Sequence, residues 1–311
     1  MIADYTSALH DGPWHHELVP ANGARFHAAV CEPAEPRPAP LVVLLHTFPQ
    51  YWWAWRHQLP AIAAAGYRVA AIDLRGNGAS DKPPLGYDTP MRTRDVAGVV
   101  RSLGADRAVV VGHGTGGTVA WAMAALQPAV TAGVAALAAP HPARLHVSGR
   151  RVLTRVARRH LAFAQVPGVP ERALAHGDLV DRLLDDGAVV PFERDVVETY
   201  RTALRIPFAA HGALEGARWP VRSLSVPSGR RFTGSMRRRI DVPALLAIGE
   251  HDPFVRRRGV DTDAAALARH LRIEEVPGVG HYLPEEAPDA VSALLVDWLD
   301  DVTSRPGPRA A

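Results

Sequence analysis

A short apolar run that ends in a cluster of glycines constrains this chain more than any other feature. Residues 108–111 are apolar, and four of the next six residues are glycine. Such a run, bounded by glycine, is typical of a strand buried on both faces of a parallel sheet. Residues 118–126 then have the pattern of a helix. The stretch therefore predicts a strand, a tight turn and a helix in direct succession.

The same alternation continues along the chain. An Asn22-Gly23 dipeptide between alternating segments predicts a hairpin of residues 14–19 and 24–31. Further strands are expected at 41–45, 67–73, 134–137, 242–249 and 272–276, and helices at 53–65, 93–103, 262–270 and 288–302. Strands that alternate with helices indicate an α/β fold with a doubly wound, mostly parallel sheet.

The alternation stops near Pro140 and resumes at Val242, and helical patterns broken by prolines fill the gap. We therefore expect a helical cap inserted after the sixth strand. The predicted division is an α/β core at 1–142 and 239–303, a cap at 143–238 and a flexible tail at 304–311.

Composition is that of a globular protein, with 47% hydrophobic and 22% charged residues. No apolar run reaches the roughly 18 residues of a membrane span, and the N-terminal residues lack the pattern of a signal peptide. A single cysteine, Cys31, leaves no internal disulfide and fits a reducing compartment. We expect a cytoplasmic protein.

Charge is concentrated in the expected cap. Residues 143–238 contain 17 Arg, no Lys and 9 Asp or Glu. This basic segment fits an anionic partner, or simply a set of solvated helices. No spacing of zinc ligands and no nucleic-acid-binding motif is present, so the sequence predicts neither a metal, a cofactor nor nucleic acid as a partner.

The glycine-rich turn has the small-x-nucleophile-x-small spacing of a nucleophile elbow, which lifts one reactive side chain above the end of a sheet. In this register the lifted residue is Gly114, which bears no reacting atom. The neighbouring His113 is expected to pack beneath the turn.

Several motifs accompany the elbow, and together they carry a family resemblance. They are His46-Thr47-Phe48-Pro49, Trp52, Trp55-Arg56-His57-Gln58, Asp73-Leu74-Arg75-Gly76-Asn77-Gly78-Ala79-Ser80-Asp81-Lys82-Pro83 and Gly280-His281. Over almost its whole length the chain resembles the epoxide-hydrolase-like branch of the α/β-hydrolase fold superfamily. The nucleophile position of that pattern is occupied by Gly114.

The resemblance implies roles for four further residues. Enzymes of this branch use a carboxylate nucleophile, a histidine that activates water and an acid that orients the histidine. His281 and Asp252 match the last two, in the chain order of the superfamily. The backbone N–H groups of Phe48 and Thr115 would form the oxyanion hole, which Thr47 would crowd because the family usually has glycine there.

In the cap, the branch uses two tyrosines that donate hydrogen bonds to the epoxide oxygen. Tyr200 resembles the second, whereas Phe163 stands where the first would be. With Trp52 and His113, these residues are the expected cap and pocket positions.

Three functions follow from these residues. The first is a catalytically degenerate protein that binds a small apolar ligand, or a partner, in a pocket between core and cap. The second is a non-covalent hydrolase of epoxides or esters, or a lyase, in which the His281–Asp252 dyad acts as a general base on water or substrate. The third is a basic surface module that docks on anionic partners. The sequence favours the first.

Overall fold

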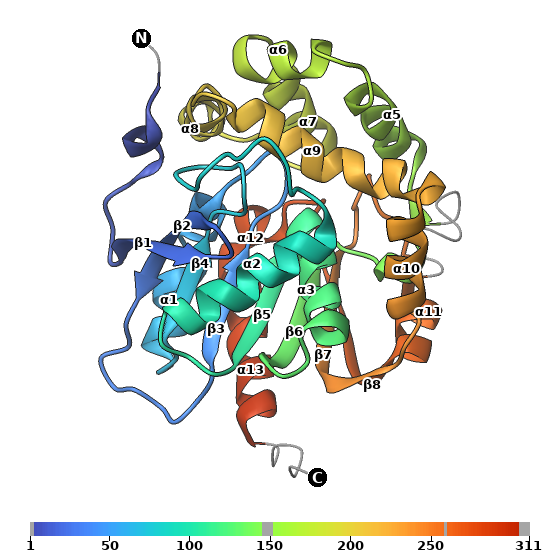
Figure 1. The fold of residues 1–311 in the computed structure, drawn as a ribbon. Coiled ribbons are helices and arrows are strands. Elements are labelled where there is room, and N and C mark those ends of the chain that lie inside the picture. The colour runs from blue at the N-terminus through green and yellow to red at the C-terminus, as the bar shows by residue number, and fades with distance from the viewer. Residues whose placement is uncertain (1–2, 145–151, 258–259, 305–311) are drawn as a thin grey trace.

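The computed structural model describes residues 3–144, 152–257 and 260–304. It contains an eight-stranded sheet in the order β1-β2-β4-β3-β5-β6-β7-β8 (Figure 1). Strands β1 and β2 form an antiparallel hairpin, β2 pairs antiparallel with β4, and the other neighbours are parallel. The strands are β1 His15–Ala21, β2 Ala24–Cys31, β3 Leu41–Leu45, β4 Val69–Ile72, β5 Ala108–His113, β6 Thr131–Leu137, β7 Ile240–Gly249 and β8 Ala268–Val276.

The hairpin turn depends on its two central residues. Asn22 and Gly23 adopt φ angles of 46° and 76°. A type I′ turn needs positive φ at both positions, and asparagine followed by glycine provides it at the least steric cost. The hairpin predicted from this dipeptide is confirmed.

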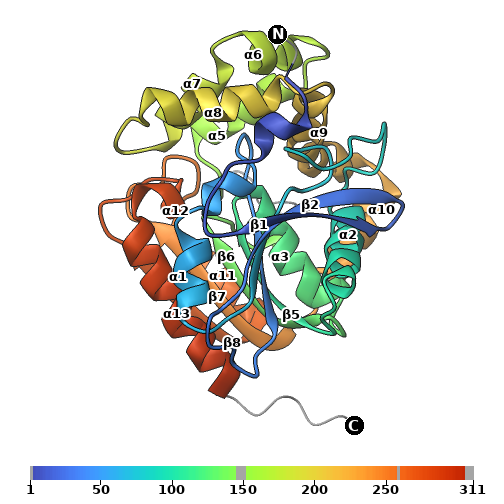
Figure 2. The same cartoon turned by 90° about the vertical axis from the view of Figure 1, so that its left-hand side faces the viewer.

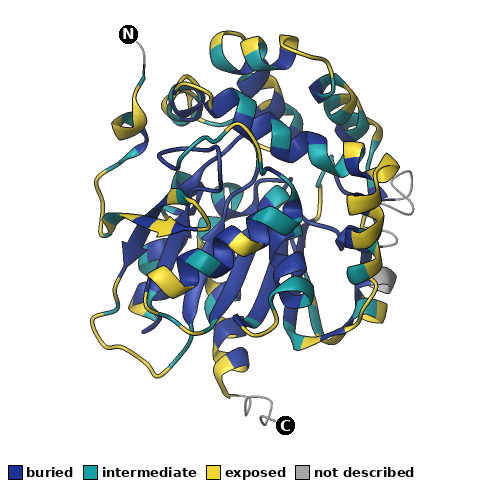
Figure 3. Ribbon diagram, viewed as in Figure 1, coloured by how far each residue is buried: buried dark blue, intermediate teal, exposed yellow. Residues whose placement is uncertain are grey.

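Helices cover both faces of the sheet (Figure 2). On one face, α1 (Gln58–Ala64) packs with α13 (Pro288–Ser304). On the other lie α2 (Thr89–Ser102), α3 (Thr115–Leu126) and α11 (Val260–Leu267). All residues of β3, β4 and β5 are buried as a result, and Figure 3 draws these central strands in dark blue. The predicted doubly wound, mostly parallel fold is confirmed.

Helix α2 begins four residues before its predicted start. The side chain of Asp88 caps it by accepting a hydrogen bond from the backbone N–H of Met91, and Pro90 lies in the first turn, where its missing N–H costs nothing. Apolar periodicity alone does not reveal this first turn because it contains Thr89 and Pro90.

Six helices lie wholly within the described residues between β6 and β7. This is the predicted insertion after the sixth strand. They are α5 Arg155–Ala164, α6 Val169–His176, α7 Leu179–Gly187, α8 Arg194–Leu204, α9 Ala209–Arg222 and α10 Pro227–Ser235. Helices α5 to α9 form a layer over the carboxyl ends of the strands, and α10 lies lower, against the side of the core that carries α3 (Figures 1 and 2). The short elements are η1 Tyr5–Ala8, η2 Trp52–Trp55, η3 Ser223–Ser225 and α12 Leu283–Glu286.

None of the helices in the described ranges is long and apolar enough to cross a membrane. The predicted flexible tail, 304–311, falls outside the described residues after Ser304.

Candidate functional site

The turn between β5 and α3 is built around Gly114. Its φ of 50° lies in the left-handed region that glycine tolerates best. The neighbouring small residues allow a close approach, since a Cβ at Gly116 would lie 2.4 Å from the carbonyl oxygen of Leu45. The first turn of α3 therefore packs directly against the end of β3, which brings the residues after β3 beside Gly114.

Thr47, two residues after β3, occupies the space next to Gly114. A Cβ built on Gly114 would lie 2.1 Å from Thr47 Oγ1 and 2.8 Å from Thr47 Cβ. Both distances are below 3.0 Å, a separation that real Cβ atoms essentially never show. A residue with a side chain at position 114 therefore requires Thr47 to move.

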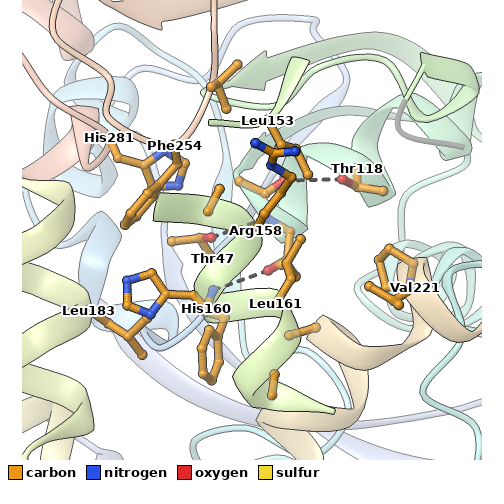
Figure 4. Close-up of a pocket in the computed structure, with 18 of the residues that line it drawn as sticks. Thr47, Thr118, Leu153, Arg158, His160, Leu161, Leu183, Val221, Phe254 and His281 are labelled. Carbon is orange, nitrogen blue, oxygen red and sulfur yellow. Dashed lines mark hydrogen bonds between the residues drawn. The ribbon is translucent and has the colours of Figure 1, made fainter. Parts of the chain in front are cut away.

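The two N–H groups expected to form the oxyanion hole already have partners. The backbone N–H of Thr115 donates to Thr47 Oγ1 at 3.2 Å, and that of Phe48 donates to Thr115 Oγ1 at 3.2 Å. Figure 4 labels Thr47 at this position and marks the hydrogen bonds between the residues drawn as dashed lines. An oxyanion at this position would have to displace two threonine hydroxyls.

His281 and Asp252 lie together opposite Gly114. Nδ1 of His281 is 3.0 Å from Oδ2 of Asp252, and the other carboxylate oxygen accepts hydrogen bonds from the N–H groups of Phe254 and Val255 at 2.8 and 3.0 Å. The Asp252 side chain is 1% exposed and that of His281 is 9% exposed. Because Nδ1 faces the carboxylate, Nε2 faces the cavity, 3.4 Å from the Cβ position on Gly114. Such a dyad can accept a proton from water or a ligand.

The loop that carries His281 is held on three sides. Nε2 of the buried His113 donates to the carbonyl oxygen of His281 at 2.7 Å, and the N–H of His281 donates to the carbonyl oxygen of Gly187 in α7 at 2.8 Å. Burial keeps the pKa of His113 well below its usual value, so His113 acts as a neutral donor. Glu286 accepts from the N–H groups of Gly280 and Tyr282 at 3.0 and 2.8 Å.

A cavity of about 580 Å³ lies between the sheet and the cap, and Gly114 is among the residues that line it. Figure 4 shows part of its wall. This volume is within the usual range for small-molecule sites. Thr47, Phe48, Gly114, Thr115 and His281 line one end, and mostly apolar residues of α5, α7 and α9 line the rest. Phe163 is among the lining residues, and the ring of Phe254 lies 4.8 Å from that of His281.

Tyr200, expected at the pocket, is not among the described residues that line this cavity. The residue is fully buried, and its hydroxyl accepts a hydrogen bond from Nε2 of Gln50 at 3.3 Å. Its ring packs edge-on against Tyr51 and Trp53, with centroid distances of 5.8 and 5.9 Å. Helix α8 therefore turns this tyrosine towards an aromatic cluster around η2, away from Gly114.

Trp52 and His113 are likewise placed outside the cavity walls. The Nε1–H of Trp52 donates to the carbonyl oxygen of Ala8 at 2.7 Å, and its backbone N–H donates to Oδ1 of Asp73 at 3.0 Å. Burial pushes the pKa of Asp73 upward, but the hydrogen bonds from His27 and from the N–H of Trp52, together with the electrostatic effect of the neighbouring imidazoles, push it downward by more. The net effect is a pKa below the usual value for aspartate. Trp52 and Asp73 thus connect η2 to the loop after β4 and support the site from behind.

The cavity wall also contains two polar residues that the sequence did not indicate, Arg158 and His160. Both belong to α5, and Figure 4 draws them beside the apolar side chains of that helix. The spacing of Ala157, Leu161 and Ala164 at three and four residues marks the face of α5 that lines the cavity. Within the described residues, no group of three or more His, Cys, Asp or Glu could hold a metal ion.

Comparison with known proteins identifies the family. Residues 42–294 match the α/β hydrolase family. The chain is 30% identical over 300 residues to epoxide hydrolase 3 of Xenopus tropicalis, covering 90% of this chain and 76% of that protein. It is also 30% identical over 324 residues to epoxide hydrolase A of Mycobacterium tuberculosis, covering 93% and 98%.

Solved structures agree with these relatives. Epoxide hydrolase A of Mycobacterium thermoresistibile superposes with a TM-score of 0.76 at 28% identity, covering 92% of this chain and 98% of that one. The chain therefore belongs to the α/β hydrolase family and to its epoxide-hydrolase-like branch.

Proposed function

We propose that this protein binds a small apolar molecule in the cavity between sheet and cap and lacks the covalent step of its relatives. The observation that carries the proposal is that Gly114 has no side chain and that Thr47 fills the volume a side chain would need. The turn residue has no side chain, and Thr47 Oγ1 lies 2.1 Å from the point that a Cβ would take. Loss of the nucleophile of a hydrolytic triad lowers turnover by roughly 10⁶-fold, so covalent hydrolysis is not expected.

The hydrogen bonds around the turn support this proposal. Thr47 and Thr115 hydroxyls hold the two N–H groups that would stabilise an oxyanion. Glycine at 114 also removes the strain of a positive φ, which costs about 1–3 kcal/mol for other residues. Both features favour a stable binding site over a reactive one.

A second function is favoured by the His281–Asp252 pair. The imidazole is oriented by a buried carboxylate 3.0 Å away, and its other nitrogen faces the cavity. A general base placed in this way contributes about 10²–10⁴-fold. It would activate water against an epoxide or ester, or remove a proton from a substrate in a lyase reaction. His281→Ala should abolish such turnover, and full activity in that variant would exclude this mechanism.

A mass-spectrometric experiment tests the first proposal. The wild type is incubated with styrene oxide, and its intact mass should stay unchanged. Gly114→Asp alone should also stay unmodified because Thr47 blocks the added side chain. The double variant Thr47→Gly/Gly114→Asp should form an alkyl-enzyme ester, and adding His281→Gln should let this adduct accumulate. An adduct on the wild type would overturn the proposal.

An anionic partner at the arginine-rich cap and a cytoplasmic location remain predictions. Exposed arginines at and after α10 support such a partner, namely Arg230, Arg231, Arg237, Arg238 and Arg239. Binding at this surface should weaken steeply as salt is added, because exposed charges are screened.

A further inference from the structure

Among the described residues that line the cavity, the only side chain with a permanent charge is a cation. The described lining residues include one guanidinium, that of Arg158, and the imidazoles of His160 and His281, but no aspartate or glutamate. The remaining walls are largely leucine, alanine, valine and phenylalanine. An uncharged apolar molecule would therefore leave the charged group of this cavity without a counterpart.

Each imidazole already has its own carboxylate. His281 Nδ1 lies 3.0 Å from Asp252, and His160 Nε2 lies 2.8 Å from Asp186. Asp186 also pairs with Arg159 at 2.9 Å. Positive charge on either imidazole would thus be balanced from behind, on the side away from the cavity.

Arg158 has no such carboxylate partner in the part of the chain that the structure describes. Its Nε–H donates to the carbonyl oxygen of Thr154 at 3.2 Å, and within the described residues no carboxylate forms an ion pair with it. The side chain is half-buried among apolar neighbours. A cation in apolar surroundings is unfavourable until an anion pairs with it. The planar guanidinium suits a carboxylate, which it can bind through two parallel hydrogen bonds.

We propose that the ligand of this cavity is an amphipathic monocarboxylate, whose carboxylate pairs with Arg158 and whose apolar chain fills the space along Leu161, Phe163 and Leu183. This inference rests on the proposed binding function and names the class of ligand. A single unpaired cation matches one negative charge. Phosphorylated and dicarboxylic ligands would bring more negative charge than the cavity can balance.

Three probes of equal chain length isolate the charge. Decanoate, decanol and decylamine are titrated into the protein by isothermal calorimetry at pH 8. Decanoate should bind at least tenfold more tightly than decanol, and decylamine should bind most weakly. Arg158→Met, which keeps the volume and removes the charge, should lower the affinity for decanoate at least tenfold and leave that for decanol unchanged.

Arg155→Met is the matched control, because Arg155 lies one turn earlier in α5, is exposed and does not line the cavity. It should leave both affinities unchanged. Equal binding of decanoate and decanol, or an unchanged decanoate affinity in Arg158→Met, would overturn the carboxylate assignment and leave the apolar binding function intact. Failure of all three probes to bind would overturn both. A covalent adduct with styrene oxide would overturn only the non-covalent proposal.

Discussion

Gly114 and Thr47 compete for one small volume at the end of the sheet, so the effect of a substitution at one depends on the other. Gly114→Ala places a side chain at a φ of 50° and 2.1 Å from Thr47 Oγ1. The backbone strain alone costs about 1–3 kcal/mol. We expect the free energy of unfolding, measured by urea denaturation, to fall by more than this strain explains.

Two companion variants separate strain from collision. Gly104 has a φ of 77° and nothing within 4 Å of a Cβ, so Gly104→Ala should show the strain alone. Adding Thr47→Gly to Gly114→Ala should restore the part of the unfolding free energy that strain does not explain, with a coupling of about 0.5–3 kcal/mol between the two sites. Strictly additive effects at the two sites would contradict the shared volume.

At the scale of elements, one carboxylate joins the cap to the loop of His281. Oε1 of Glu286 accepts from the N–H of Tyr282 at 2.8 Å, and Oε2 accepts from Gly280 at 3.0 Å and Val189 at 2.8 Å. Glu286→Gln should destabilise the protein by at least about 1.5 kcal/mol, because hydrogen bonds to charged groups contribute about 1.5–3 kcal/mol. Hydrogen exchange at the amides of Gly280 and Tyr282 should accelerate with it.

Glu250→Gln provides the comparison. This exposed carboxylate accepts a single N–H, that of Gly278, at 2.8 Å. Glu250→Gln should lower the free energy of unfolding by less than Glu286→Gln does. It should leave hydrogen exchange at the amide of Tyr282 unchanged. Equal effects of the two variants would mean that Glu286 does not restrain the loop.

The order of elements could be read from the sequence, whereas contacts across elements could not. The glycine turn, the Asn22-Gly23 hairpin and the insertion after β6 are local patterns that packing did not override. The threonine hydrogen bonds depend on β3 lying next to β5, which only the sheet order fixes. The direction of the Tyr200 side chain depends on how α8 is rotated about its axis where it packs against η2. The apolar periodicity of the sequence does not reveal that rotation.

The pairing of Asp252 with His281 could be predicted only in part from the sequence. Both residues follow parallel strands, and the carboxyl ends of parallel strands meet at one edge of the sheet. Proximity was therefore predictable. Their chemical role depends on what replaces the nucleophile, and it stays a prediction.

At the scale of the whole molecule, several histidines are held neutral by burial. Burial is the main reason that the pKa is lowered in His10, His16, His46, His57, His113 and His141. Such a group binds a proton in the unfolded chain below about pH 6.5 but not in the folded one. This contribution to the free energy of unfolding is fully present above about pH 6.5 and is lost as the pH falls. The loss is up to about 1.4 kcal/mol per pH unit for a fully buried histidine and smaller for His10, His16 and His57, which are partly or largely exposed.

His141 provides the sharpest test, because burial lowers its pKa to about 3. Its Nδ1 accepts from the N–H of Ala143 at 3.3 Å, its ring packs on Trp121 at 5.0 Å, and its Nε2 has no partner within the described residues. In His141→Gln, the loss of unfolding free energy between pH 6.5 and 4.5 should shrink by about 2–3 kcal/mol. Urea midpoints across this range measure it, with exposed His176→Gln as the control. An unchanged pH slope in His141→Gln would mean that this imidazole is already protonated in the fold.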